Sequence, residues 1–182
     1  MTRGEDRRAK VTRLRELAAA QPDSAAAHLR LGTTLARTGA LGEAERELRR
    51  ALELVPEMPE ALVNLGGVML SRWDFRSCVE VNRQAGERQP TLTLAHYNQG
   101  LGHLYLGEAA EMTACFRRVL ELEPRNAGGH YYLALGLHAL GELEPARTHL
   151  AIAMELGFKP EPEFLRALEK TAETTVPTLE IG

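Results

Sequence analysis

Aromatic residues and long apolar runs are scarce in this sequence. Aromatics make up 5% of its 182 residues, which is a low share for an enzyme built around large stacked pockets. No apolar run approaches the roughly 20 residues that a bilayer-spanning helix needs. The first residues, MTRGEDRRAKVTRLREL, also lack the apolar stretch of about 7–15 residues that marks a secretory signal. These absences argue against membrane insertion and against secretion.

Cysteine and net charge are also low. The two cysteines, Cys78 and Cys115, are too few for a disulfide framework or a zinc site. Each stands among apolar neighbours in a helical pattern, so we expect two small buried side chains, no metal, no cofactor and a reducing, cytoplasmic location. The net charge of −3 is not that of a protein that attracts nucleic acid. The basic start of the chain has acidic neighbours and no interleaved aromatics, which favours a solvated helix face. We therefore expect no nucleic acid as a partner.

The sequence does contain an internal repeat with a period of about 34 residues, and repeats of this length decide the fold class. Four series of residues recur at this constant spacing, which we call the repeat period, and they stay in phase. They are the prolines Pro22, Pro56, Pro90 and Pro124; the small residues Gly32, Gly66, Gly100 and Ala134; the turn residues Gly39, Trp73, Gly107 and Gly141; and the series Ala44, Cys78, Met112 and Ala146. Four series in phase are not an accident of composition.

Each repeat is predicted to form two helices. In the first repeat, Ser24 is a good N-cap and Gly39 is a stop signal. The apolar and small residues between Leu41 and Leu52 then follow helical spacing, and Pro56 ends the second helix. We expect ten helices and no sheet. The predicted segments are an N-terminal helix at 5–21, repeats at 25–58, 59–92, 93–126 and 127–160, a capping helix at 161–173 and an extended tail at 174–182.

The first repeat carries a recognisable order of bulky, small and turn residues, namely His28, Leu31, Gly32, Leu35, Gly39, Ala44, Leu48, Ala51 and Pro56. This order resembles the tetratricopeptide repeat. The resemblance implies an all-α fold, a right-handed superhelical solenoid of four helix pairs in a single domain spanning 1–182. The chain departs from the family at Trp73, which replaces the turn glycine, and at Asn82, where an apolar residue is usual. Gly102 and Gly136 recur inside predicted helices at a cost of ~1 kcal/mol each, and the sequence gives no reason for them.

In the resembled family, one side of each first helix lines a concave groove that takes peptides or partner helices. Helical geometry and a shift by the repeat period give the candidate binding residues on that side. They are Arg30, Arg37, Asn64, Tyr97, Asn98, Leu101, Tyr105, Tyr131, Tyr132 and His138. All four tyrosines of the chain belong to this set, and interfaces favour tyrosine because it joins apolar area to a hydrogen-bonding tip.

Two pairs within this set suggest what the groove would bind. Asn64 and Asn98 could hold the backbone of an extended peptide, because an amide donates and accepts at once, and the pair resembles an asparagine ladder of the family. The equal alternative is that both are solvated or bond locally. Arg30 and Arg37 could meet an acidic segment, or they could be solvated arginines that contribute little.

The histidines could have structural roles or could act as ligands. His28, His96 and His130 share the bulky packing position of successive repeats. One histidine per repeat does not bring together the three or four ligands that zinc needs, so we expect structural roles. His138 is the one histidine on the groove side, and its alternative is a surface polar group.

The pattern contains no nucleophile with a base and an orienting group, so we expect no enzyme. We interpret the chain as a protein–protein interaction scaffold that binds a partner peptide or helix in its groove. The alternative is an assembly chaperone or structural subunit of a secretion or enzyme complex, which would use the convex face or the termini. The tail TVPTLEIG has a proline that blocks a helix. It could dock in a groove, its own or that of a neighbouring molecule, or be a disordered terminus.

Overall fold

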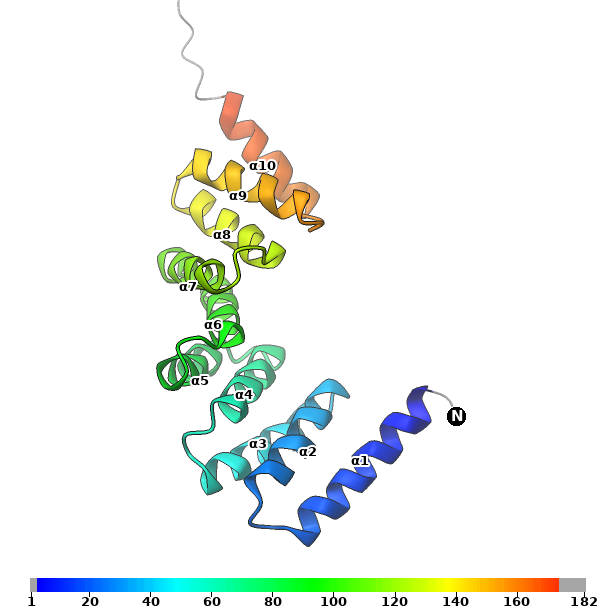
Figure 1. Cartoon of the computed structure of the whole chain (residues 1–182). Helices are drawn as coiled ribbons and strands as arrows, with labels where there is room; N and C mark the ends of the chain where they lie inside the picture. Colours follow the sequence, from blue (N-terminus) through cyan, green and yellow to red (C-terminus); the bar gives the residue numbers. More distant parts are fainter. Residues whose placement is uncertain (1–2, 174–182) are drawn as a thin grey trace, which may run out of the picture. The chain divides into compact units, whose positions relative to one another are not determined.

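A computed structural model describes residues 3–173, and within this range the chain forms ten α-helices and no strand (Figure 1). This confirms the predicted number and order of helices. The helices are α1 (Arg3–Ala20), α2 (Ala25–Arg37), α3 (Leu41–Leu54), α4 (Pro59–Ser71), α5 (Phe75–Arg88), α6 (Thr93–Leu106), α7 (Ala109–Leu122), α8 (Ala127–Ala139), α9 (Leu143–Glu155) and α10 (Pro162–Glu173). The predicted tail at 174–182 lies outside the described residues.

The helices fall into two compact units, which we call the N-terminal unit (residues 1–106) and the C-terminal unit (residues 107–182). The N-terminal unit holds α1 to α6, and the C-terminal unit holds α7 to α10. The boundary falls between the two helices of the predicted repeat 93–126. The division into four repeats within one domain therefore stays a prediction, and each unit is described by itself.

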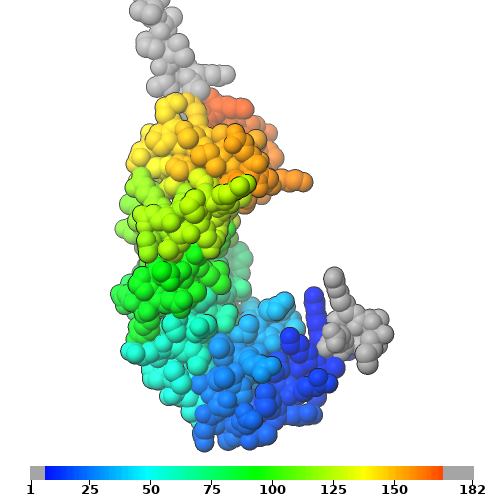
Figure 2. Space-filling view, viewed as in Figure 1, coloured from blue at the N-terminus to red at the C-terminus, as the bar shows by residue number. Residues whose placement is uncertain are grey.

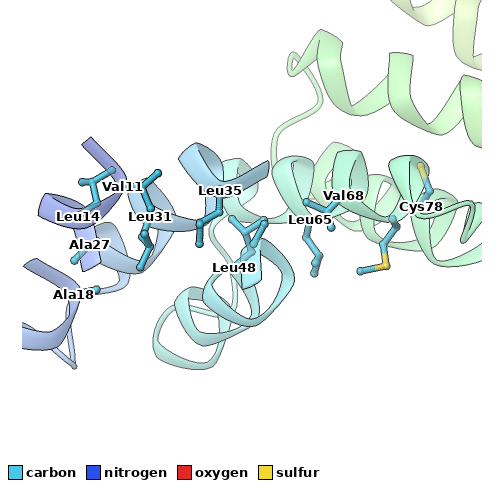
Figure 3. Close-up of a cluster of buried hydrophobic side chains, with 12 residues drawn as sticks. Val11, Leu14, Ala18, Ala27, Leu31, Leu35, Leu48, Leu65, Val68 and Cys78 are labelled. Atoms are coloured by element: carbon cyan, nitrogen blue, oxygen red, sulfur yellow. The ribbon is translucent and has the colours of Figure 1, made fainter. Parts of the chain in front are cut away.

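The core of the N-terminal unit is a continuous cluster of buried apolar side chains from α1 to α5 (Figure 3). Leu14 of α1, Leu31 and Leu35 of α2, Leu48 of α3 and Leu65 of α4 all belong to it. Side chains of α1 lie against those of α2 (Figure 2). Because Leu14 stands one repeat period before Leu48, α1 packs on α2 through the residue position that Leu48 occupies in α3.

Four turns between consecutive helices use the left-handed backbone region, where only glycine is free of steric cost. Gly39, Gly107 and Gly141 have φ values of 83°, 75° and 80°. Trp73 occupies the equivalent turn with a φ of 64°, and among the described residues it is the one non-glycine with positive φ. A side chain in this region costs roughly 1–2 kcal/mol. The departure seen in the sequence at Trp73 is therefore a strained turn and not a changed turn type.

Close approach within each helix pair explains two glycines of the repeat. A Cβ atom added to Gly32 would lie 2.8 Å from Cγ of Leu48, and one added to Gly66 would lie 2.0 Å from Nδ2 of Asn82. Leu48 and Asn82 are equivalent positions, one repeat period apart. In these two helix pairs, glycine is therefore required where this side chain of the second helix packs onto the first helix.

Asn82 puts an amide at a position where an apolar residue is usual. The side chain is 0% exposed, and Nδ2 donates to the backbone oxygen of Cys78 at 2.8 Å. Among the described residues, Oδ1 of Asn82 accepts no hydrogen bond. A buried acceptor without a partner costs about 1–3 kcal/mol, so this position is a weak point of the core.

Close approach between successive pairs accounts for Gly102 and Gly136, which the sequence left unexplained. A Cβ atom added to Gly102 would lie 2.7 Å from Cγ2 of Val79 on α5, and one added to Gly136 would lie 2.4 Å from Oγ1 of Thr113 on α7. Val79 and Thr113 are themselves one repeat period apart. The same interhelical contact thus occurs once in each unit, and its tightness outweighs the helix propensity of about 1 kcal/mol that glycine gives up.

Two buried histidines hold the loop that precedes their helix. Nε2 of His28 lies 3.1 Å from the backbone oxygen of Pro22, and Nε2 of His130 lies 2.9 Å from that of Pro124. Since a carbonyl only accepts, Nε2 must carry the proton in both rings. His96 makes the same contact with Pro90 at 3.1 Å. These three histidines therefore act as structural ties at the repeat boundaries.

The partner of the other ring nitrogen differs between the two units. In the N-terminal unit, Nδ1 of His28 lies 2.7 Å from Oε2 of Glu47. In the C-terminal unit, Nδ1 of His130 lies 2.9 Å from Nδ1 of His149. Burial lowers the pKa of His149 below its ordinary value, and the charges of His130 and Arg117 lower it further. The Nδ1 partner is thus a carboxylate in one unit and a second imidazole in the other.

The lowered pKa of His149 predicts that the C-terminal unit loses stability in acid. Between its lowered folded pKa and the unfolded value near 6.5, the unfolded state binds more protons, so stability falls as the pH drops through this window. Thermal unfolding of the whole chain followed by circular dichroism between about pH 7.5 and pH 5 measures the effect. The variant His149→Glu copies Glu47 opposite His28 and should flatten the slope; an unchanged slope would contradict the assignment to His149.

Candidate functional site

The first helices of the N-terminal unit, α2, α4 and α6, contact one another in order, α2 with α4 and α4 with α6. We call the surface that carries Arg30, Thr33, Asn64, Asn98 and Leu101 the first-helix face. It is the side that lines the groove in the resembled family. Its residues come from equivalent turns of three helices, because the repeat period places them on the same side of each helix.

Asn64 bridges two of these helices. Its Nδ2 donates to Oγ1 of Thr33 at 3.0 Å, which links α4 to α2. The side chain is half-buried, and its amide oxygen has capacity left to accept. Asn64 therefore combines the local hydrogen bond that the sequence offered as one alternative with an acceptor that remains at the surface.

Asn98 occupies the equivalent position of α6 and has a different environment. Its side chain is 8% exposed and lies against Gly67 of α4, where an added Cβ would be 3.9 Å from Nδ2. The backbone oxygen of Asn98 accepts from Sγ of Cys78 at 3.4 Å. Its amide makes no hydrogen bond with any residue that the structure describes. Gly67 stands one repeat period after Thr33, so Asn98 lacks the hydroxyl that satisfies Asn64.

An aromatic cluster stands beside the end of the first-helix face. The rings of Phe75 and Tyr105 stack with centroids 4.5 Å apart, and Trp73 lies 5.9 Å and 6.1 Å from them. Trp73 is 75% exposed and Tyr105 is 55% exposed. Sequence reasoning found Tyr105 but did not join it to Trp73 and Phe75. Trp73 in place of a turn glycine was the signal that could have found the cluster.

The remaining residues assigned to the N-terminal unit are distributed over its surface. Tyr97 and Leu101 are half-buried on α6. Arg30 and Arg37 are both exposed on α2. Arg37 lines a pocket with residues of α1 and Arg30 does not. The two arginines that the sequence paired therefore belong to different surroundings.

In the C-terminal unit, aromatic side chains near α10 cover part of α8. Tyr131 stacks on Phe158 at a centroid distance of 4.3 Å and meets Phe164 of α10 edge-on at 5.9 Å. It is only 6% exposed, and burial raises the pKa of its phenol while the backbone of Glu161 hydrogen-bonds the hydroxyl. Tyr131 is thus packed inside its own unit and offers almost no surface to a partner.

The other two residues assigned to this unit are more accessible. Tyr132 stacks on Phe116 at 5.1 Å and is half-buried. His138 is half-buried and meets Phe164 edge-on at 5.5 Å. Phe158 lies near the end of the last predicted repeat, where the earlier repeats have proline, and Phe164 lies beyond it, so a shift by the repeat period predicts neither aromatic ring over Tyr131 and His138.

Chemistry other than binding finds little support in the described residues. Burial raises the pKa of the Cys78 thiol to about 11 and that of the Cys115 thiol to about 11, so neither is a ready nucleophile. Within residues 7–169, whose side chains the structure describes, no three of His, Cys, Asp or Glu gather as metal ligands. None of the described helices is both long and apolar enough to span a membrane.

Comparisons with known proteins agree with the repeat. A family model for the tetratricopeptide repeat matches residues 6–59, which include α2 and α3 and most of α1. No curated protein matches the chain in sequence.

Solved structures of MamA have a similar fold. One is 19% identical over 95% of this chain and 98% of that chain, with a TM-score of 0.77. MamA from Desulfovibrio magneticus RS-1 is 20% identical over 82% of this chain and 85% of that chain, with a TM-score of 0.76. A structure of MamA AMB-1 is 23% identical over 84% and 90% of the two chains, with a TM-score of 0.75. At such identities the likeness concerns the fold alone. The repeat period, the helix pairs, the family match over residues 6–59 and these structures together show that the chain has the fold of a tetratricopeptide-repeat solenoid.

Proposed function

We propose that this protein is an interaction scaffold whose first-helix face holds an extended segment of a partner protein. The observation that carries the proposal is the amide of Asn98, which is almost buried and has no hydrogen-bond partner among the described residues. Covering an unpaired amide completely costs about 1–3 kcal/mol, and a partner backbone that covers Asn98 would supply both the donor and the acceptor that it lacks.

Neighbouring residues add the contacts that an extended segment needs. The free acceptor of Asn64 lies one repeat away from Asn98 at the same offset, so both amides could bond one backbone. Leu101 and Tyr97 add apolar area, and Tyr105 with Trp73 adds exposed aromatic surface. In the C-terminal unit, Tyr132 and His138 are the proposed contacts, whereas Tyr131 is too buried to contribute.

The proposal is tested by selecting peptides from an immobilised random library with the whole chain and measuring their affinity. Two lost hydrogen bonds of ~1 kcal/mol each predict that Asn64→Ala/Asn98→Ala binds the selected peptides roughly 30-fold more weakly. The matched control is Arg49→Ala/Arg76→Ala on a different surface, lined by α3, α4 and α5. Unchanged affinity in the asparagine variant, or an equal loss in the control, would favour the alternative of an assembly subunit that uses another face.

The C-terminal tail is a proposed competitor for this face, in the same molecule or in a neighbouring one. Residues 174–182 lie outside the described structure, and their sequence carries the apolar residues Val176, Leu179 and Ile181 and one proline. A chain without them should bind the selected peptides more tightly or change its oligomeric state. If neither changes, the tail has no such role. The reducing cytoplasm remains the proposed location, because both cysteines are free thiols.

A further inference from the structure

A pocket of about 560 Å³ lies between α1 and the end of α2. Its volume falls within the range of roughly 300–1,000 Å³ that is usual for ligand sites. Arg7, Arg8 and Arg15 of α1 and Arg37 of α2 line it, and the almost buried side chains of Val11 and Leu35 lie at its base. We call it the arginine pocket. It is separate from the first-helix face, because neither Asn64 nor Asn98 lines it.

The charge of the arginine pocket is mostly unbalanced within the described structure. Arg15 pairs with Glu43 at 2.6 Å. No ion pair joins Arg7, Arg8 or Arg37 to a carboxylate among the side chains that the structure describes. The whole chain carries a net charge of −3, so this cluster is a local exception. A concave surface lined by one sign of charge concentrates ligands of the opposite sign.

The shape and lining of the pocket decide which anion fits. Guanidinium groups bind carboxylates and phosphates through paired hydrogen bonds. A single phosphate would leave most of the volume of about 560 Å³ unfilled. None of the residues that line the pocket is aromatic, whereas single-stranded nucleic acid is held by basic residues together with aromatic stacking. A peptide that carries several carboxylates matches both the charge and the volume.

We infer that the arginine pocket binds an acidic peptide segment of a partner protein, with carboxylates on Arg7, Arg8 and Arg37. Arg15 is already paired with Glu43, so its charge is less available to a ligand. This site does not depend on the first-helix face. Loss of one should leave the other intact, so their tests fail or succeed separately.

The test uses the whole chain, since Glu5 and Asp6 precede the arginines of the pocket in the sequence. The probe is a fluorescein-labelled peptide, Gly-Asp-Leu-Asp-Glu-Leu-Asp-Gly, and its fluorescence anisotropy is measured at increasing salt. We expect Arg7→Glu/Arg8→Glu and Arg37→Glu each to weaken binding by about tenfold or more. The matched control is Arg13→Glu, an exposed arginine on α1 outside the pocket, which should bind nearly as well as the unchanged chain.

Three results would overturn the inference. The unchanged chain could fail to bind the peptide, Arg13→Glu could weaken binding as much as the pocket variants, or the pocket variants could bind normally. Phosphatidylserine vesicles and a single-stranded oligonucleotide serve as competing probes. If either is bound through Arg7 and Arg8 while the peptide is not, the partner class is wrong. Circular dichroism melting of each variant separates lost binding from lost folding.

Discussion

Replacing Gly66 with alanine is expected to lower the free energy of unfolding of the N-terminal unit by about 3 kcal/mol. The new Cβ would lie 2.0 Å from Nδ2 of Asn82 and 2.7 Å from its Cγ. Asn82 cannot move aside cheaply, because it is fully buried and its amide bonds the backbone oxygen of Cys78. The gain in helix propensity, ~1 kcal/mol, offsets only part of this cost. Urea denaturation measures the change, and hydrogen exchange in α4 and α5 assigns it to this unit.

The adjacent glycine provides a matched control for this prediction. A Cβ added to Gly67 would meet its nearest atom, Nδ2 of Asn98, at 3.9 Å, which is ordinary contact. Gly67→Ala should therefore be neutral or slightly stabilising. Adding Asn82→Ala to Gly66→Ala should recover much of the loss, since the clashing amide is gone. Equal effects of alanine at both glycines would show that helix propensity, and not the contact with Asn82, controls stability here.

Replacing Asn82 with leucine is expected to stabilise the N-terminal unit by about 2 kcal/mol. The substitution removes the buried Oδ1 that lacks a partner, which costs about 1–3 kcal/mol, and adds apolar burial, against the loss of one hydrogen bond worth ~1 kcal/mol. Leucine fits this position in another repeat, because Leu48 packs over Gly32 as Asn82 packs over Gly66. The midpoint of urea denaturation should rise with an unchanged m-value.

The reciprocal change tests the same argument in the first repeat. Leu48→Asn puts an amide into a fully buried site. It should destabilise the unit, since burying an amide without partners for all its hydrogen-bonding groups costs free energy. If Asn82→Leu were destabilising instead, the amide of Asn82 would contribute more through Cys78 than its unsatisfied oxygen costs. The buried network of Asn82 and Cys78 would then be a requirement of this helix pair.

Much of the fold could be predicted from the repeat period, because the period shows where helix caps and turn glycines recur along the chain. Ser24 caps α2 as predicted, with its side chain accepting from the backbone nitrogen of Ala27. Gly39 ends the same helix in the left-handed region. These features depend on a few neighbouring residues. The helix pairs follow from them, since each pair can bury its apolar side only against the next.

The candidate site was less predictable, because it depends on contacts that the period does not encode. The burial of Tyr131 needs Phe158 and Phe164, which lie at and beyond the end of the last predicted repeat. The difference between Asn64 and Asn98 needs the replacement of Thr33 by Gly67 on the preceding first helix. The position of Arg37 needs the packing of α1. In each case the decisive neighbour belongs to another helix or to the turn before it.

The strained turn at Trp73 also has a consequence for spectroscopy. Trp73 is the only tryptophan in the chain, and its indole is largely exposed beside Phe75 and Tyr105. Intrinsic tryptophan emission therefore reports on the N-terminal unit alone. A partner segment that covers the aromatic cluster would shift this emission to shorter wavelength. Melting of the C-terminal unit, in contrast, would be seen by circular dichroism and be silent in tryptophan fluorescence, so the two signals together separate the events of the two units without any label.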